Sequence, residues 1–163
     1  MDNACVRSAD KKDLNDIMQI YSSAREFMAK NGNPNQWGKT FPPKELILND
    51  IKTGKLFVIE QNGIVHGVFA FIIGNDPTYA RIENGSWLSC SEYGAIHRVA
   101  SDGEIHGVLK TAVDYCLTKI KHLRIDTHND NKVMQNRILK NGFSKCGTIF
   151  TDNGSPRIAY ERI

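Results

Sequence analysis

Apolar residues recur at helical spacing in two long segments of the chain. In the first segment they are Leu14, Ile17, Met18, Tyr21, Ala24 and Met28. Asp10 and Asp13 have the spacing of an N-cap and its third helical position, so we expect a helix from Asp10 to about Lys30. In the second segment, Glu104–Ile120, the apolar set is Ile105, Val108, Leu109, Ala112, Val113, Cys116, Leu117 and Ile120. This unbroken series predicts the strongest helix of the chain.

Two shorter helices are predicted over Lys44–Lys52 and Lys132–Asn141. Gly142 ends the second of these, with Phe143 placed to fold back on it. The predicted strands are Cys5–Ser8, Leu56–Glu60, Ile64–Ile73, Tyr93–Ala100, His122–Thr127, Lys145–Thr151 and Arg157–Ile163. Asn62-Gly63 is a strong hairpin turn, while the segments 31–43 and 74–92 are predicted to be irregular.

The order of elements is β-α-α-β-β-β-α-β-α-β-β, without repeats or a linker. The central β-α-β unit requires a parallel pair, and the hairpins on either side require antiparallel pairing. We therefore expect residues 1–163 to form a single α/β domain, with a mixed sheet and helices on both faces.

Composition narrows the class of protein. Of the 163 residues 40% are hydrophobic and 24% charged, which is typical of a globular domain with a core. The net charge of +3 comes from dispersed basic residues, so we expect no nucleic-acid partner.

The longest apolar stretch, Ile64–Ile73, is too short for a membrane span. The first residues lack the apolar centre of a secretory signal, so the expected location is cytoplasmic. Cys5, Cys90, Cys116 and Cys146 are far apart in sequence and are expected to be free thiols.

Most sequence motifs of catalysis are missing, among them the phosphate loop, the dinucleotide fingerprint and the nucleophile elbow. Asp126, His128 and Asp130 alternate as metal ligands sometimes do, but the other residues of a calcium or zinc site do not accompany them, so we expect no metal. Ile96–Cys116 is more informative, because a strand, a glycine-bearing loop and a helix follow one another. The free N–H groups at such a helix start bind phosphate, although ordinary strand-to-helix turns have the same pattern.

The order of elements, this segment and the stretch RIDTHNDNKVMQNRILKNGFSKCGTIF together resemble the GNAT N-acetyltransferase superfamily. The most specific part is Asn131 followed by a helix that ends in Asn141-Gly142-Phe143. The resemblance covers Val6 to Tyr160 and implies a GNAT-like, mostly antiparallel sheet with a central splayed parallel pair that holds acetyl-CoA. It implies transfer of acetyl from acetyl-CoA to an amine, on a small molecule or a protein, by direct attack in a ternary complex.

The resemblance also implies where acetyl-CoA binds. The cofactor strand is Ile96–Ala100, its loop is Ser101–Val108, and the splayed partner is His122–Thr127. The implied cofactor-binding residues are Arg98, Val99, Gly103, His106, Gly107, Val108 and Asn131. A backbone N–H near Val99 serves as the donor to the tetrahedral oxyanion.

Two positions depart from the family pattern. The family loop reads Q/R-x-x-G-x-G/A, whereas residues 104–109 keep only Gly107 and place the negative Glu104 near the diphosphate. Arg98, His106 or Lys110 would offset that charge. Ile138 stands where many members carry a tyrosine that protonates the leaving thiolate. These departures motivate an alternative, a non-catalytic acyl-CoA-binding or sensing module on the same fold.

The candidate bases are Asp126 and His97, with Glu92 and Tyr93 as further options. Each has a structural alternative: Asp126 as the cap of the next helix, and His97 as a packed histidine. The expected contacts to the acceptor amine are Gln36, Trp37, Trp87 and Tyr93. A loop tryptophan forms either a pocket wall or a lid over the core. An exposed strand edge near the C-terminus makes a homodimer possible.

Overall fold

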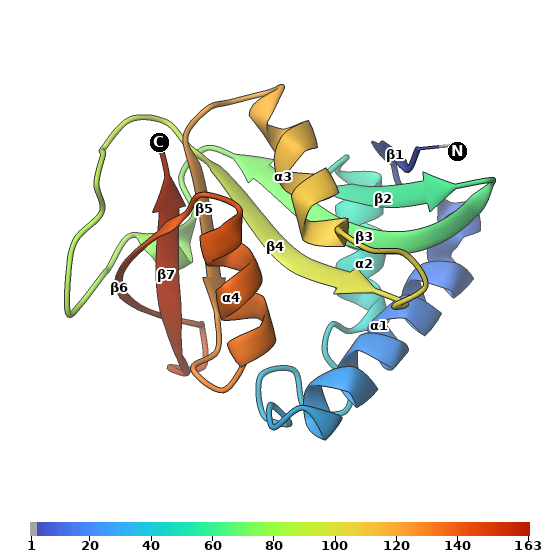
Figure 1. The fold of residues 1–163 in the computed structure, drawn as a ribbon, viewed down its shortest axis with the longest axis horizontal. Helices are drawn as coiled ribbons and strands as arrows, with labels where there is room; N and C mark the ends of the chain where they lie inside the picture. Colours follow the sequence, from blue (N-terminus) through green and yellow to red (C-terminus); the bar gives the residue numbers. More distant parts are fainter. Residues whose placement is uncertain (1–2) are drawn as a thin grey trace.

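The strands form one seven-stranded sheet with the order β1-β2-β3-β4-β5-β7-β6 (Figure 1). The computed structural model describes residues 3–163. The strands are β1 (Cys5–Ser8), β2 (Leu56–Gln61), β3 (Ile64–Ile73), β4 (Gly94–Ser101), β5 (Leu123–Thr127), β6 (Ser144–Phe150) and β7 (Pro156–Arg162). The pair β4–β5 is parallel and the other neighbours are antiparallel. The predicted mixed, mostly antiparallel sheet is confirmed.

Helices cover both faces of this sheet, as predicted. They are α1 (Leu14–Lys30), α2 (Lys44–Lys52), α3 (Val108–Leu117) and α4 (Lys132–Lys140). The helices α3 and α4 lie on one face, and α1 and α2 lie on the other (Figure 1). Among residues 3–163, no helix combines the length and the apolar character that crossing a membrane requires.

Side chains alternate between the two faces of the sheet along each strand, and the buried apolar ones form three clusters. Toward α3 and α4, Ile96 and Ile125 pack with Val113 and Ile138. Toward α1 and α2, Ile17 and other apolar side chains pack on β2 and β3. A fully buried aliphatic side chain contributes about 1.5–3 kcal/mol to the free energy of unfolding. The third cluster contains Tyr79, Tyr93, Ala95, Ile149 and Ala159, and the irregular segment 74–93 supplies its two tyrosines. This segment therefore replaces a helix over part of the sheet.

The structure contains the predicted N-cap at Asp10 and the predicted hairpin turn at Asn62-Gly63. The Asp10 backbone N–H donates to Asp13 Oδ2 at 2.7 Å and the Asp10 side chain accepts in return, which completes the expected capping box. The first turn, Lys11–Asp13, is a 3₁₀ turn, so α1 itself begins at Leu14. Asn62 and Gly63 both have positive φ, at 53° and 78°, as the tight turn between β2 and β3 requires.

The boundaries of the two predicted elements on either side of the loop 102–107 were wrong. The helix predicted from Glu104 begins at Val108 and ends at Leu117. Gly103 and Gly107 are left-handed, with φ of 85° and 76°, so residues 104–107 form a loop, although Ile105 still packs on the core and keeps the apolar spacing. The strand predicted from Tyr93 begins at Gly94 and ends at Ser101. The irregular segment 74–92 contains a 3₁₀ turn, η2 (Pro77–Tyr79).

Candidate active site

The parallel strands β4 and β5 separate halfway along their length. They pair over Gly94–Ile96 and Leu123–Ile125. On the other side of β4, Ala70 pairs with His97 and Val68 with Ala100, so β4 holds one more residue than β3. Such a bulge bends and twists its strand. We call the separated ends, residues 97–101 of β4 and 126–127 of β5, the splay.

The two predicted bases meet on one face of the splay, and two further residues join them. His97 Nδ1 lies 3.8 Å from Asp126 Oδ1, and His97 Nε2 lies 2.5 Å from Asp76 Oδ2. The Tyr79 hydroxyl donates to Asp126 Oδ1 at 2.7 Å. The Tyr79 ring also lies against the His97 ring, with centroids 5.6 Å apart. We call Asp76, Tyr79, His97 and Asp126 the acid–base cluster.

Electrostatics fix the protonation of two members of the acid–base cluster. Burial alone would raise the pKa of Asp76, but the hydrogen bond and charge of His97 and the bonds from Thr78 outweigh it and hold the pKa at about 2. Burial and the neighbouring Asp126 carboxylate raise the pKa of Tyr79 well above its ordinary value, so its hydroxyl stays a donor. His97 is therefore held by a carboxylate at Nε2 and directs Nδ1 toward Asp126. A histidine oriented in this way accepts a proton at its other nitrogen.

Asp126 does not cap α4, contrary to its structural alternative. Asn131 is the N-cap: its Oδ1 accepts from the Met134 backbone N–H at 3.1 Å. The Asn131 Nδ2 donates to Gln36 Oε1 at 3.0 Å. A predicted cofactor residue and a predicted acceptor residue are thus hydrogen-bonded to each other beside the end of β5.

The loop between β4 and α3 is held by its own side chains. Ser101 Oγ accepts from the Gly103 N–H at 3.0 Å, and Asp102 Oδ1 accepts from the Glu104 N–H at 2.9 Å. The first hydrogen bond of α3 runs from the Thr111 N–H to the Gly107 carbonyl at 2.9 Å. The N–H groups before it, including that of Val108, point out of the helix start, where the helix dipole favours an anion.

The side chains around this helix start carry mixed charge. His106 and Glu104 are exposed and line a groove of about 680 Å³ with Lys110. The Lys110 ammonium pairs with Asp114 at 2.5 Å along the exposed face of α3.

Arg98 does not lie at this loop, which corrects the prediction for its side chain. Its guanidinium pairs with Asp50 on α2 at 2.5 Å, and its carbonyl accepts from the Tyr21 hydroxyl at 2.9 Å. The physical reason is the bulge: Arg98 has φ of 52°, so it departs from the strand alternation and its side chain reaches α2. Its charge therefore does not offset Glu104.

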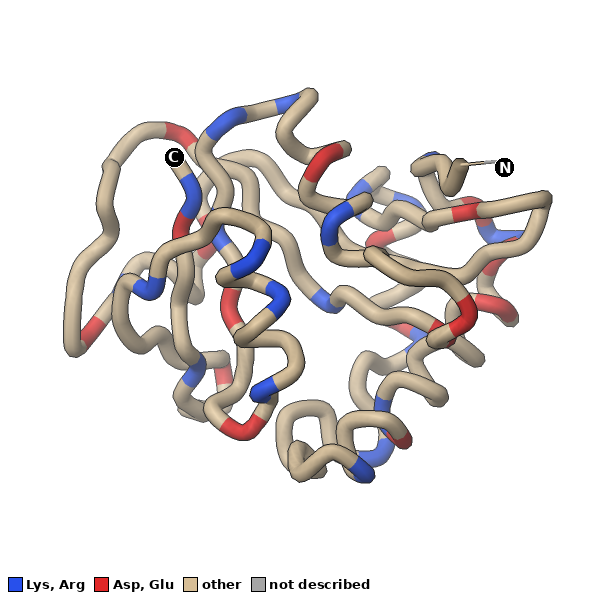
Figure 2. Tube along the Cα trace, viewed as in Figure 1, with Lys and Arg blue, Asp and Glu red and all other residues tan. Residues whose placement is uncertain are grey.

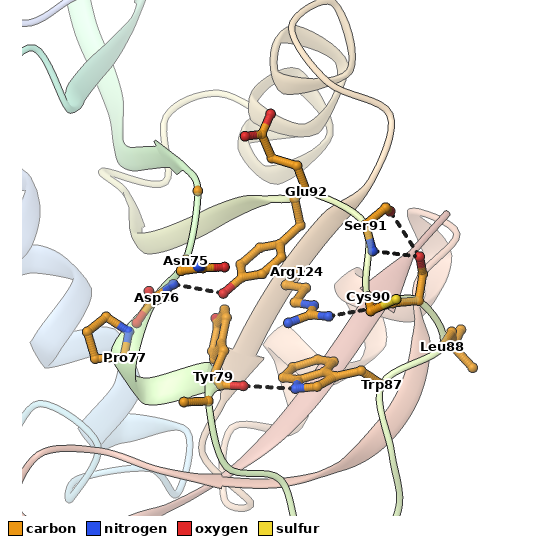
Figure 3. Close-up of a pocket in the computed structure, with 14 residues that line it drawn as sticks. Asn75, Asp76, Pro77, Tyr79, Trp87, Leu88, Cys90, Ser91, Glu92 and Arg124 are labelled. Carbon is orange, nitrogen blue, oxygen red and sulfur yellow. Dashed lines mark hydrogen bonds between the residues drawn. The ribbon is translucent and has the colours of Figure 1, made fainter.

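The four predicted acceptor contacts fall in two places. Gln36 lies at Asn131, and Trp37 packs beside it against Tyr21 and Phe41 on the α1 side. Trp87 and Tyr93 instead line a pocket of about 950 Å³ under segment 74–93 (Figure 3).

Three residues of this region were missed by the sequence reasoning: Asp76, Tyr79 and Arg124. Arg124 lies between the rings of Trp87 and Tyr93, with its guanidinium carbon 3.9 Å from each ring centre. Asp76 and Tyr79 stand in an irregular segment, and Arg124 stands in a strand without a motif. Only the alternation along β5, which puts Arg124 on the same face as Asp126, offered a clue.

The buried residues Ile138, Cys116 and Cys146 offer no reactive group to this cluster. Ile138 lies on α4 itself and is fully buried, and its side chain has no proton to donate. Burial raises the pKa of Cys116 to about 12 and that of Cys146 to about 11, so both are inert packing residues. Within residues 3–163, no group of three or more His, Cys, Asp and Glu side chains is placed to hold a metal ion.

No protein-family model matches the chain, and no curated protein sequence matches it. Solved structures do. A GNAT-family acetyltransferase from Streptococcus agalactiae is 29% identical, with a TM-score of 0.89 over 98% of this chain and 95% of that chain. A ribosomal-protein-alanine N-acetyltransferase from Brucella melitensis is 18% identical, with a TM-score of 0.63 over 98% and 99% of the two chains.

A putative acetyltransferase from Salmonella typhimurium, solved with its cofactor acetyl-CoA, is 15% identical, with a TM-score of 0.57 over 98% and 92% of the two chains. These similarities extend over nearly the full length of both partners and agree with the parallel pair β4–β5 at the centre of a mostly antiparallel sheet. The chain therefore has the fold of the GNAT N-acetyltransferase superfamily.

Proposed function

We propose that this protein is an acetyl-CoA-dependent N-acetyltransferase. One observation carries the proposal: the acid–base cluster occupies one face of the splay, and the free N–H groups of the α3 start lie at the end of the same strand, β4. The similarity to acetyltransferases supports acetyl transfer in general. The salmonella neighbour, which binds acetyl-CoA, supports the choice of acetyl donor.

The residues around α3 suit the phosphates of acetyl-CoA. Gly107 has φ of 76°, and a side chain there would meet no atom within 4 Å, so the backbone is open to a ligand. We assign the diphosphate to the N–H groups of Gly107 and Val108, with His106 beside them, and Gly103 to the turn that presents them. Helix α4 adds three basic residues and no acidic one, namely Lys132, Arg137 and Lys140 (Figure 2). This charge favours an anionic donor.

The backbone of β4 in the splay suits the acyl end of the donor. Beyond Ile96 this strand no longer pairs with β5. The backbone of Val99 is therefore assigned to the donor, with its N–H directed at the thioester oxygen, where a hydrogen bond strengthens as the oxyanion forms. Asn131 completes the site at the end of β5, where its amide N–H leaves Gln36 and donates to acetyl-CoA instead.

The acid–base cluster supplies the proton chemistry. In the proposed mechanism His97 takes the proton of the acceptor ammonium at Nδ1, and Asp76 at Nε2 stabilises the resulting imidazolium. Asp126 attracts and orients the ammonium, while Tyr79 holds the Asp126 carboxylate. The free amine attacks the thioester carbon, and the tetrahedral intermediate collapses as the thiolate of CoA leaves. Because Ile138 offers no proton, the second proton of the amine nitrogen passes through water to that thiolate.

A thermal melt with acetyl-CoA tests the donor site. Ligand at a hundred times its dissociation constant adds about 2.7 kcal/mol, or roughly 5–10 °C in the melting temperature of a domain of this size. Gly107→Glu should abolish the shift by placing charge and a side chain at the phosphate site. Gly54→Glu is the matched control, because Gly54 also has positive φ and open space but lies between α2 and β2. Equal shifts in both variants would contradict the assignment of Gly107.

A further inference from the structure

The pocket under segment 74–93 contains a buried cation that is only partly paired. Arg124 is 5% exposed and lies between two aromatic rings. Its Nε donates to Glu161 at 3.1 Å, and its Nη2 donates to the Ser89 carbonyl at 2.8 Å. The described residues offer Nη1 no hydrogen-bond partner, and in Figure 3 this nitrogen points into the pocket toward Tyr79.

The acidic groups nearby do not supply the missing partner. Glu161 already accepts from His122, from Arg124 and from the Leu88 N–H at 2.5 Å. Asp76 is engaged by His97 and by Thr78. The Glu92 carboxylate points away from Arg124 (Figure 3). A buried guanidinium with a free N–H edge that opens into a pocket is a site for an oxygen anion.

The shape of the pocket selects among anions. The rings of Trp87 and Tyr93 lie on either side of the guanidinium, so a group in its plane must fit between flat walls. A planar carboxylate meets this condition better than a tetrahedral phosphate. Tyr79 extends the aromatic lining, which suits an apolar or aromatic body attached to the carboxylate.

We propose that this pocket binds a carboxylate through Nη1 of Arg124, and that the carboxylate belongs to the acceptor. The inference rests on the proposed function, since it names the acceptor as an aminocarboxylate. The pocket shares Asp76 and Tyr79 with the acid–base cluster. Arg124 pairs in register with Ala95, and His97 lies on the same face of β4, two residues or roughly 7 Å along the strand from Ala95. In this proposal a molecule held by its carboxylate at Arg124 directs its amine along that face, past the ring of Tyr79, toward His97.

The first arm of the test measures binding without any acetyl transfer. Calorimetric titration with 3-phenylpropanoate should show saturable binding to the wild type. Arg124→Lys should weaken it about 10-fold or more, because one charge-assisted hydrogen bond is lost. Arg81→Lys is the matched control, since Arg81 also lies on an aromatic ring, that of Phe150, but outside the pocket. Trp87→Leu, which keeps all charges, should weaken binding several-fold and serves if Arg124→Lys does not fold.

The second arm measures acetylation of phenylalanine and of phenethylamine, which differ only in the carboxylate. Arg124→Lys should lower kcat/KM about 10-fold or more for phenylalanine and leave it unchanged for phenethylamine. Absence of saturable 3-phenylpropanoate binding, tighter binding of phenyl phosphate, or an equal loss for both amines would overturn the inference. Carboxylate binding without transfer to any amine would instead contradict the proposed function, and leave the carboxylate site supported.

Discussion

At the residue scale, the proposed chemistry of the splay depends on His97, which Asp76 binds at Nε2 and Asp126 approaches at Nδ1. The carboxylate at Nε2 belongs to Asp76, whose side chain is only 10% exposed and whose partner is 2.5 Å away. This geometry orients the ring and leaves Nδ1 for proton transfer. Asp76 is a positioning residue in this account, because it acts through His97 and not on the reacting atoms.

The pair of Asp76 and His97 makes part of the free energy of unfolding depend on pH. The pKa of Asp76 is about 2 in the folded chain, below its ordinary value of 3.8. A depressed pKa stabilises the fold above the unfolded value, and this contribution is lost as pH falls through the folded value, here between about pH 4 and pH 2. Asp76→Asn should cost about 1 kcal/mol at pH 6 and almost nothing at pH 2, as urea unfolding at each pH will show. A cost that stays constant with pH, or one equal to that of the exposed Asp114→Asn, would count against the pair.

At the element scale, the start of α3 combines a good anion site with an unfavourable neighbour. Glu104 is exposed in the loop that precedes the helix. In the proposed donor site its charge repels the diphosphate, at a distance where screened interactions are worth less than about 1 kcal/mol. Glu104→Gln should therefore tighten acetyl-CoA binding about 2- to 5-fold, and more at low salt. The control is Glu26→Gln on the exposed face of α1, and equal calorimetric affinities for all three proteins would remove Glu104 from the site.

Asn131 has two separable roles: its side-chain oxygen caps α4, and its side-chain amide is proposed to contact acetyl-CoA. Asn131→Ala removes the cap and should lower the free energy of unfolding by about 1 kcal/mol. Asn131→Asp keeps an oxygen for the Met134 N–H but loses the amide that donates to Gln36. Urea unfolding should find the Asp variant close to the wild type, while acetyl-CoA binding weakens in both variants. Wild-type affinity in the Asp variant would show that the amide does not contact the donor.

At the scale of the whole molecule, sequence periodicity predicted the elements, their order and the parallel pair. It failed where the backbone leaves regular geometry. The glycine-bearing loop before α3 keeps the apolar spacing of a helix because Ile105 packs on the core, so the predicted helix began too early. The bulge at Arg98 turned a side chain from the expected loop to Asp50.

The candidate site was predictable only in part, for the same physical reason. His97 and Asp126 each follow the last paired residue of their strand, Ile96 and Ile125, so strand order and alternation put them on one face and close together. Asp76 and Tyr79 reach them from segment 74–93, whose path is set by packing on the sheet and not by local sequence. Arg124 carried no motif, and its environment of Trp87, Tyr93 and Glu161 exists only in the folded chain.

The most direct test of the account is transfer of labelled acetyl from acetyl-CoA to a panel of amines, with His97→Ala measured beside the wild type. The account predicts N-acetylated product with the wild type and a kcat about 10²–10⁴-fold lower for the variant, since a general base contributes that much. Acetyl-CoA affinity should be equal in the two proteins. Acetyl-CoA binding without transfer to any amine would contradict the account and identify a binding or sensing module, and full activity of His97→Ala would contradict the role of the acid–base cluster.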